Sequence, residues 1–294
     1  MGAWAQPPSS RSRPPRPGVT AAASTPPSTD ETGHPLASPE LDDDLALALA
    51  LCDEADELTT HHFRAHDLHV ETKPDDTPVT EADRAVETMM QERLDVSRPG
   101  DAILGEEFGL VGDSPRRWIV DPIDGTKSFV RGVPAWATLL ALESDGVLVV
   151  GVVSAPALGR RWWARQGGGA YANGDRIHVS GIEAIEDAHV CGPNERNFEQ
   201  AGLGDAYRTL ARRAWRAVGF ADFWGHALVA EGAVDIMVEP TLGVWDIAAL
   251  RPIVEEAGGR VSDLTGDGWA EGAPCLTTNG RLHDDVLDLM RANP

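Results

Sequence analysis

The sequence has few cysteines and no long apolar run. Its 294 residues contain three cysteines, Cys52, Cys191 and Cys275, which are far apart and form no CxxC pair. Such an odd, scattered set indicates reduced thiols, because secreted domains use paired cysteine frameworks. No apolar segment approaches the ~20 residues that a transmembrane helix needs, and the N-terminus lacks the apolar core of a secretory signal. These absences predict a cytoplasmic protein without a membrane segment.

Basic residues are also scarce. Lysine and arginine number 25 against 47 aspartates and glutamates, which gives a formal net charge of −22. Nucleic acids and anionic membranes are bound through basic patches, so the composition argues against both kinds of partner. An acidic protein attracts metal cations and cationic small molecules, although a solvated acidic surface is the simpler interpretation of this charge.

Residues 1–40 differ in composition from the rest. They hold nine of the 21 prolines, many serines and threonines, and almost no large aliphatic residues. Such a segment buries too little apolar surface to offset its ordering entropy. We predict a disordered extension over residues 1–40, to which no function is assigned, and a folded domain over residues 41–294.

The chain after residue 40 alternates helical and strand patterns. Helical patterns occupy 41–63, 81–94, 198–212, 225–231, 246–257 and 284–291. Strand patterns occupy 102–104, 118–120, 138–143, 147–154, 161–165, 188–191 and 233–238. Asp145-Gly146, between two of these strands, is typical of a tight hairpin. The alternation predicts a single mixed α/β sandwich.

The most informative segment is Asp121-Pro122-Ile123-Asp124-Gly125-Thr126. It follows the apolar run 118–120 and precedes a helical pattern, so two carboxylates stand at the end of a strand. Divalent cations prefer carboxylate oxygens, and phosphate groups bind the free N–H groups at a helix start. The segment therefore predicts a site for metal and phosphate.

Other acidic residues also stand at the ends of predicted elements. Glu106 and Glu107 follow the strand 102–104, Asp246 begins a helix after Trp245, and Asp83 lies where a loop enters a helix. Each alone is more simply a surface group or a helix cap. Together they indicate one site, because ligands of α/β proteins gather at sheet ends.

These motifs resemble those of the inositol monophosphatase superfamily. The two signatures are matched by 121–126 and by Trp245-Asp246-Ile247-Ala248-Ala249, and the further acidic motifs by 105–107 and 78–83, in the family's order. The hairpin segment 168–174 is also similar, and the resemblance covers roughly residues 41–290. It implies a layered α-β-α-β-α sandwich of the inositol monophosphatase and fructose-1,6-bisphosphatase type, usually a homodimer.

The resemblance further implies a Mg²⁺-dependent phosphomonoesterase with two or three ions in its active site. Its ligands would be Glu106, Asp121, the Ile123 carbonyl, Asp124 and Asp246, with Asp121 bridging two ions and a third, weaker ion beside Glu106. Thr126, oriented by Asp83, would help to deprotonate a metal-bound water that attacks phosphorus. The N–H groups of Gly125 and Thr126 would hold the phosphate. Two-metal chemistry and oxygen-only ligands agree with this assignment.

Two other classes remain to be weighed. Haloacid dehalogenase-type phosphatases attack phosphorus with an aspartate, but their second aspartate comes two positions later, whereas Asp124 comes three after Asp121. A covalent phosphate on Asp121 would favour that class. An inactive metal-binding scaffold is the non-enzymatic alternative, although all the expected acids and Thr126 are present.

The substrate is indicated by two carboxylates. The resemblance implies that Glu239, seven residues before Asp246, binds substrate, and Asp222 stands where inositol-type members usually have a small or neutral residue. Two carboxylates suit a substrate with an amine or imidazolium. The segment 125–136 is most similar to the histidinol-phosphate phosphatase branch. L-Histidinol phosphate is thus the preferred substrate, inositol 1-phosphate the nearest alternative, and 3′-phosphoadenosine 5′-phosphate and fructose 1,6-bisphosphate less favoured ones.

Overall fold

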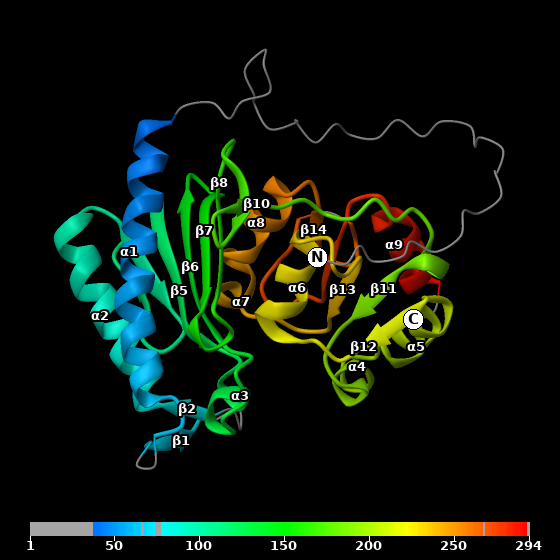
Figure 1. Ribbon diagram of the computed structural model, residues 1–294, viewed down its shortest axis with the longest axis horizontal. Coiled ribbons are helices and arrows are strands. Elements are labelled where there is room, and N and C mark those ends of the chain that lie inside the picture. Colours follow the sequence, from blue (N-terminus) through cyan, green and yellow to red (C-terminus); the bar gives the residue numbers. More distant parts are fainter. Residues whose placement is uncertain (1–37, 66–67, 74–77, 267, 293–294) are drawn as a thin grey trace.

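Two β-sheets stand side by side in the computed structural model, which describes residues 38–65, 68–73, 78–266 and 268–292 (Figure 1). One pair of helices covers the outer face of the first sheet, three helices lie between the sheets, and a third group covers the outer face of the second. Each layer buries its apolar face against the next, as helices and sheets must. The predicted α-β-α-β-α sandwich is confirmed.

The first sheet has the strand order β10-β9-β8-β7-β6-β5-β3-β4 and is antiparallel except for the pair β3 and β5. Its strands are β3 (Ala102–Gly105), β4 (Gly109–Val111), β5 (Arg116–Asp124), β6 (Ala137–Ser144), β7 (Val147–Ala155), β8 (Arg160–Arg165), β9 (Gly169–Ala172) and β10 (Asp175–Arg176). Asp145 and Gly146 both have positive φ, of 52° and 79°, between β6 and β7. They form the predicted tight hairpin turn, which requires such angles.

Helices α1 (Pro39–His62) and α2 (Glu81–Ser97) cover the outer face of this sheet. The buried residues of α1 recur at three- and four-residue intervals, at Ala48, Leu51, Cys52 and Ala55, which gives one apolar face. Helix α2 starts at a capping box, in which the Thr80 side chain accepts from the first-turn N–H groups. This cap fixes the point where the chain enters α2 from the hairpin β1 (Val70–Thr72) and β2 (Pro78–Thr80).

The middle layer contains α6 (Asp222–Ala230), α7 (Val244–Ala248) and α8 (Leu250–Glu256). The start of α8 lies very close to β7. A Cβ placed on Gly151 of β7 would lie only 2.1 Å from the carbonyl oxygen of Ala249, the residue before α8. A glycine is needed at this position for the helix to lie directly on the strand. The middle layer is thus held against the sheet that carries the predicted metal ligands.

The second sheet has the order β12-β11-β13-β15-β14. Its strands are β11 (His189–Cys191), β12 (Arg216–Val218), β13 (Ile236–Glu239), β14 (Arg260–Ser262) and β15 (Cys275–Thr278). Its outer face is covered by α4 (Glu195–Gln200), α5 (Gly204–Arg213) and α9 (His283–Arg291). The remaining short elements are α3 (Thr126–Val130) and two 3₁₀ turns at Pro156–Leu158 and Ile185–Asp187.

The sequence predictions for two helices need correction. The segment 198–212 forms two helices, α4 and α5, separated by Gly202 at φ 73°. The segment 246–257 lies in α7 and α8, which meet at Ala249. The strand expected at 233–238 begins only at Ile236. Helical periodicity cannot show such breaks, because the apolar pattern continues across the change of direction.

The predicted extension over residues 1–40 is almost wholly outside the described residues, so its disorder stays a prediction. The helix expected from residue 41 begins two residues earlier, at Pro39. Cys52, Cys191 and Cys275 are buried and unpaired, as expected. Within the described part of the chain, no helix is both long enough and apolar enough to cross a membrane.

Candidate active site

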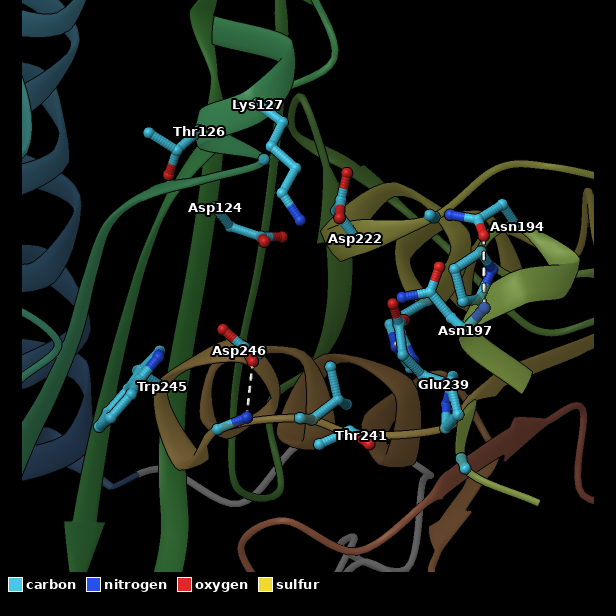
Figure 2. Close-up of a pocket in the computed structure, with 18 of the residues that line it drawn as sticks. Asp124, Thr126, Lys127, Asn194, Asn197, Asp222, Glu239, Thr241, Trp245 and Asp246 are labelled. Atoms are coloured by element: carbon cyan, nitrogen blue, oxygen red, sulfur yellow. Dashed lines mark hydrogen bonds and ion pairs between the residues drawn. The ribbon is translucent and has the colours of Figure 1, made fainter. Parts of the chain in front are cut away.

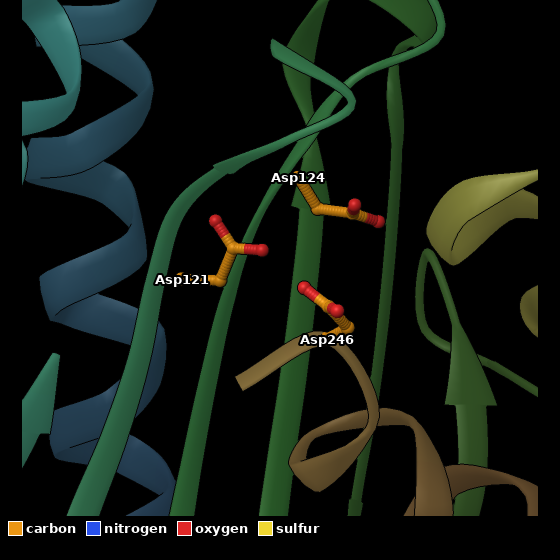
Figure 3. A group of neighbouring side chains, drawn as sticks. All are labelled: Asp121, Asp124 and Asp246. Atoms are coloured by element: carbon orange, nitrogen blue, oxygen red, sulfur yellow. The ribbon is translucent and has the colours of Figure 1, made fainter. Parts of the chain in front are cut away.

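Three aspartates meet at one end of the first sheet (Figure 3). Asp121 and Asp124 come from β5 and Asp246 from α7, and ligand oxygens of all three lie within 4.8 Å of one another. Burial raises the pKa of each carboxyl group and neighbouring carboxylates raise it further, to about 7 in Asp246. Carboxylates this close repel one another unless a cation lies among them. Their oxygen-only donor set fits a hard divalent ion.

A bulge in β5 brings Asp121 and Asp124 to the same place. Residues three apart in a regular strand point to opposite faces of the sheet. Here Asp121 pairs with Leu139 of β6 and Asp124 with Ala137, so β5 has one more residue than its partner between these pairs. The extra residue reverses the alternation and turns both carboxylates toward α7.

The bulge leaves backbone groups that the site itself satisfies. The Ile123 N–H donates to Asp121 Oδ1 at 3.0 Å, and the Thr138 hydroxyl donates to the Pro122 carbonyl at 2.8 Å. Pro122 has no N–H, so it suits a position without a ladder hydrogen bond. The Asp121 side chain is therefore fixed by the same irregularity that aligns it with Asp124.

Asp246 is held by the first turn of α7. Its Oδ2 accepts from the Gly243 N–H at 2.6 Å, which caps the helix. The following residues, Ile247 and Ala248, are buried in the middle layer and anchor α7 against the first sheet. The predicted position of Asp246 at a helix start is confirmed, and the cap orients its carboxylate toward β5.

Glu106 adjoins this cluster but is paired with a lysine. Lys73 Nζ donates to Glu106 Oε1 at 2.7 Å and to Glu107 Oε1 at 2.6 Å. Buried Glu87 of α2 accepts from the N–H groups of Glu107 and Phe108 at 2.8 and 2.9 Å, which fixes this loop. Glu106 is among the groups that raise the pKa of Asp121, after burial, so it lies close enough to act with the cluster.

Asp83 and Thr126 do not form the contact expected between them. Asp83 Oδ2 instead accepts from the Thr80 N–H at 2.7 Å and the Thr80 hydroxyl at 2.6 Å, while the Thr126 hydroxyl donates to the Ile123 carbonyl at 2.9 Å. Asp83 Oδ1 is buried and has no hydrogen-bond partner in the described residues. Burial raises the pKa of Asp83 to about 7, although the Thr80 hydrogen bonds oppose this shift. Thr126 thus constrains the Ile123 carbonyl, and Asp83 keeps one oxygen available.

Gly125 joins β5 to α3 in a left-handed conformation, with φ 81°. A Cβ at this position would lie 2.9 Å from the Ala135 carbonyl oxygen. Both facts require glycine. The turn brings Thr126 and Lys127 over Asp124, and all three line a cleft (Figure 2).

A cleft of about 790 Å³ opens above the aspartates and extends to the second sheet (Figure 2). Its first end is lined by Glu106, Asp124 and Asp246. Another wall comes from α4, α6 and the end of β13, and includes Asn194, Asn197, Asp222, His226 and Glu239. The cleft thus joins the carboxylate cluster to a second group of polar side chains.

Asp222 begins α6 with the left-handed angle φ 56°, which is rare outside glycine. The next residue holds this turn against the cluster, since the Phe223 N–H donates to Asp124 Oδ2. The pKa of Asp222 is raised to about 6, mainly by burial and also by Glu239, although Lys127 and His226 oppose this shift. Strained residues of this kind cluster at functional sites, and here the strain brings a carboxylate to the cleft wall.

Glu239 ends β13 and is buried, with a side chain 9% exposed. Its Oε2 lies 3.4 Å from Nε2 of His226, whose side chain is 1% exposed. The structure therefore brings the predicted substrate carboxylates, Asp222 and Glu239, to the same wall of the cleft.

Sequence reasoning assigned no role to His226, Thr277 or Glu87. His226 lies in an apolar helix and meets Thr277 only through the fold, 51 residues later. Glu87 is typical of an exposed helical glutamate in sequence, yet it is fully buried under the Glu106 loop. No local pattern marks such long-range contacts.

The layered α/β sandwich, with a buried oxygen-ligand cluster opening into a polar cleft, defines a metal-binding protein with a site for a small ligand. Residues 40–292 match the model of the inositol monophosphatase family, to which the chain belongs. Members of this family are metal-dependent phosphomonoesterases.

Its curated relatives include two proteins named histidinol-phosphatase. One, from Mycobacterium tuberculosis, is 52% identical over 85% of this chain and 98% of the relative; the other, from Streptomyces coelicolor, is 48% identical over 85% and 97%. Among solved structures, an IMPase of Thermotoga maritima has a TM-score of 0.77 at 33% identity, covering 85% of this chain and 97% of that one.

Proposed function

We propose that this protein hydrolyses L-histidinol phosphate to L-histidinol and phosphate, a step of histidine biosynthesis. The observation that carries the substrate is a second pair of carboxylates, Asp222 and Glu239, which lie on the wall of the cleft next to the metal-binding cluster. L-Histidinol phosphate has matching groups, with an anionic phosphate at one end and an amine and imidazole at the other. The names of the two relatives support the same substrate.

The metal proposed is Mg²⁺, with two or three ions in each site. Asp121, Asp124, Asp246, Glu106 and the Ile123 carbonyl are the proposed ligands, and all are oxygen donors, which suit Mg²⁺ better than zinc. When bound, the metal supplies positive charge that attracts the phosphate and stabilises charge developing on the reacting oxygens. Asp121, whose carboxylate interacts with those of Glu106, Asp124 and Asp246, would be the ligand shared by two ions.

The side chains of the chain perform the remaining tasks. The turn at Gly125 and Thr126 receives the phosphate, and Asp222 and Glu239 hold the cationic end of the substrate. Water that attacks phosphorus must lose a proton, and Asp83 has a buried oxygen without a partner and a pKa raised to about 7. A group of that pKa is well matched to accept a proton near neutral pH. Asp83 is therefore the proposed proton acceptor, and Thr126 is proposed to assist it.

The proposal extends to cell location, assembly and domain boundaries. Three buried free thiols support a cytoplasmic enzyme. Family resemblance supports a homodimer, which light scattering of the purified protein tests. The extension predicted over residues 1–40 is proposed to be dispensable up to the start of α1, so removing residues 1–37 should leave turnover unchanged.

A phosphate-release panel tests the proposed function. The purified protein is assayed with L-histidinol phosphate, inositol 1-phosphate, 3′-phosphoadenosine 5′-phosphate and fructose 1,6-bisphosphate while Mg²⁺ is titrated. We expect the highest kcat/KM for L-histidinol phosphate and no release without metal. A higher value for inositol 1-phosphate would transfer the assignment to that ester, and no release from any ester would favour an inactive scaffold.

A further inference from the structure

His226 is a buried histidine on the cleft wall with one nitrogen unsatisfied. Its Nδ1 lies 2.8 Å from the Thr277 hydroxyl of β15. Its Nε2 lies 3.4 Å from Glu239 Oε2, and neither of these two atoms has a hydrogen-bond partner in the described residues. The gap exceeds a usual N–H···O distance by only a few tenths of an ångström. Because buried polar groups are nearly always hydrogen-bonded, the two atoms are natural partners.

The carboxylate selects the protonation pattern of the ring. If the only ring hydrogen were on Nδ1, the lone pair of Nε2 would face Glu239 Oε2, and two acceptors would be buried against each other. The other two forms of imidazole both have a hydrogen on Nε2. In the neutral one, the Thr277 hydroxyl donates to Nδ1, so every group in the row Thr277–His226–Glu239 is satisfied.

We propose that His226 is a positioning residue, whose Nε2–H donates to Glu239 Oε2 and leaves Oε1 to bind the amine or imidazole of the substrate. This inference rests on the proposed function, because it assigns a part in the same substrate site. A carboxylate with one oxygen fixed has less freedom to lose when substrate binds. His226 thereby affects how the amine or imidazole of the substrate is bound, and it does not affect the chemistry at phosphorus.

Two amide variants separate this role from simple packing. Glutamine places an N–H near the position of Nε2, whereas asparagine reaches only the position of Nδ1. We expect His226→Asn to raise KM for L-histidinol phosphate about tenfold, the scale of one hydrogen bond to a charged group, with kcat changed less than twofold. For His226→Gln, KM for L-histidinol phosphate should stay within about threefold of the wild-type value. KM for p-nitrophenyl phosphate, which has no amine, should not change in either variant.

A double-mutant cycle adds a second readout. Once Glu239→Gln has removed the charge, His226→Asn should raise KM little further, because the two residues act through one contact. Three results would overturn the proposal: additive increases in KM in the double mutant, equal increases in KM for the two amide variants, or equal increases in KM for both esters. His283 is the matched control: it is fully buried between the Ser262 and Thr278 hydroxyls and does not line the cleft. His283→Gln should not change the ratio of the two KM values.

A measurement without metal or substrate keeps this inference separate from the proposed function. Long-range ¹H–¹⁵N NMR spectra of the metal-free protein report which ring nitrogen has a hydrogen, and the His226 signals are assigned by their loss in His226→Asn. We expect a hydrogen on Nε2, whether or not the enzyme prefers L-histidinol phosphate. An Nε2 without hydrogen would overturn the positioning role. If the wild type releases no phosphate from L-histidinol phosphate, the proposed function fails and the spectrum still decides the contact.

Discussion

Asp121→Asn should abolish turnover and make the metal-free protein more stable. Asp121 lies in a group of three aspartates whose ligand oxygens are within 4.8 Å of one another. Asparagine has nearly the same shape, and its oxygen can still accept from the Ile123 N–H that Asp121 Oδ1 now binds. The substitution therefore removes one buried charge and leaves the bulge of β5 intact. Activity is lost because the proposed bridging ligand is no longer anionic.

The size of the stabilisation follows from Coulomb's law. Two unit charges 4.8 Å apart repel by about 3 kcal/mol at an effective dielectric constant of 20. Asp121 has two such neighbours, but the pKa of one of them, Asp246, is raised to about 7, so its carboxyl group is partly protonated near neutral pH. Asp121→Asn should therefore raise the free energy of unfolding of the metal-free protein by about 3 kcal/mol and not by twice that amount. For a protein of this size it corresponds to a rise in Tm of roughly 6–12 °C.

The assay is thermal unfolding in EDTA and in Mg²⁺. The Tm of the wild type should rise when Mg²⁺ is added. The Tm of Asp121→Asn should be higher than that of the wild type in EDTA and should rise little with Mg²⁺. Asp175→Asn is the control, because this exposed residue of β10 removes the same charge from the −22 total without touching the cluster. If Asp121→Asn melts below wild type in EDTA, or as far above it as Asp175→Asn does, repulsion within the cluster is not the cause.

Three further outcomes are expected. Asp222→Asn should raise KM for L-histidinol phosphate more than KM for inositol 1-phosphate, and asparagine tolerates the positive φ of this position. Equal increases for the two esters would show that Asp222 does not determine specificity. EDTA should inactivate the enzyme and Mg²⁺ restore it, and failure of restoration would argue against metal catalysis. Burial lowers the pKa of His283 to about 4, so the unfolded chain, with a histidine pKa near 6.5, takes up the proton first as pH falls. Stability should therefore drop by about 3 kcal/mol between pH 6.5 and 4 relative to His283→Gln in urea titrations, and parallel curves would refute this cause.

The cluster of three aspartates could be predicted from the sequence, because each of them lies at the end of an apolar strand or at the start of an apolar helix. Asp121 and Asp124 end a buried strand and Asp246 starts a buried helix, and apolar runs place such ends at the same edge of the sandwich. Helices and strands with a continuous apolar pattern were likewise predicted at nearly their observed positions. Break points such as Gly202 were not, because tertiary packing decides whether a helix continues through a glycine.

The supporting contacts could not be predicted in the same way. Glu87 and His226 acquire their roles from residues 13 to 51 positions away, and nothing in the sequence around them distinguishes them from surface or core residues. Even the roles of recognised residues changed in part. Asp83 was expected to orient Thr126, but in the structure it caps α2 through Thr80, and its Oδ1 has no hydrogen-bond partner in the described residues.

The three-residue spacing of Asp121 and Asp124 has a structural reason that the sequence alone does not show. With two-residue spacing, both carboxylates would share a face of a regular strand and no bulge would be needed. With three, the strand must include an extra residue, and its freed backbone groups must find partners. Asp121 and Thr138 provide them, and Pro122 removes a donor that would otherwise need one. The metal ligands thus belong to a strand irregularity that they help to stabilise, so a change in spacing should lose alignment of the site before it loses the sheet.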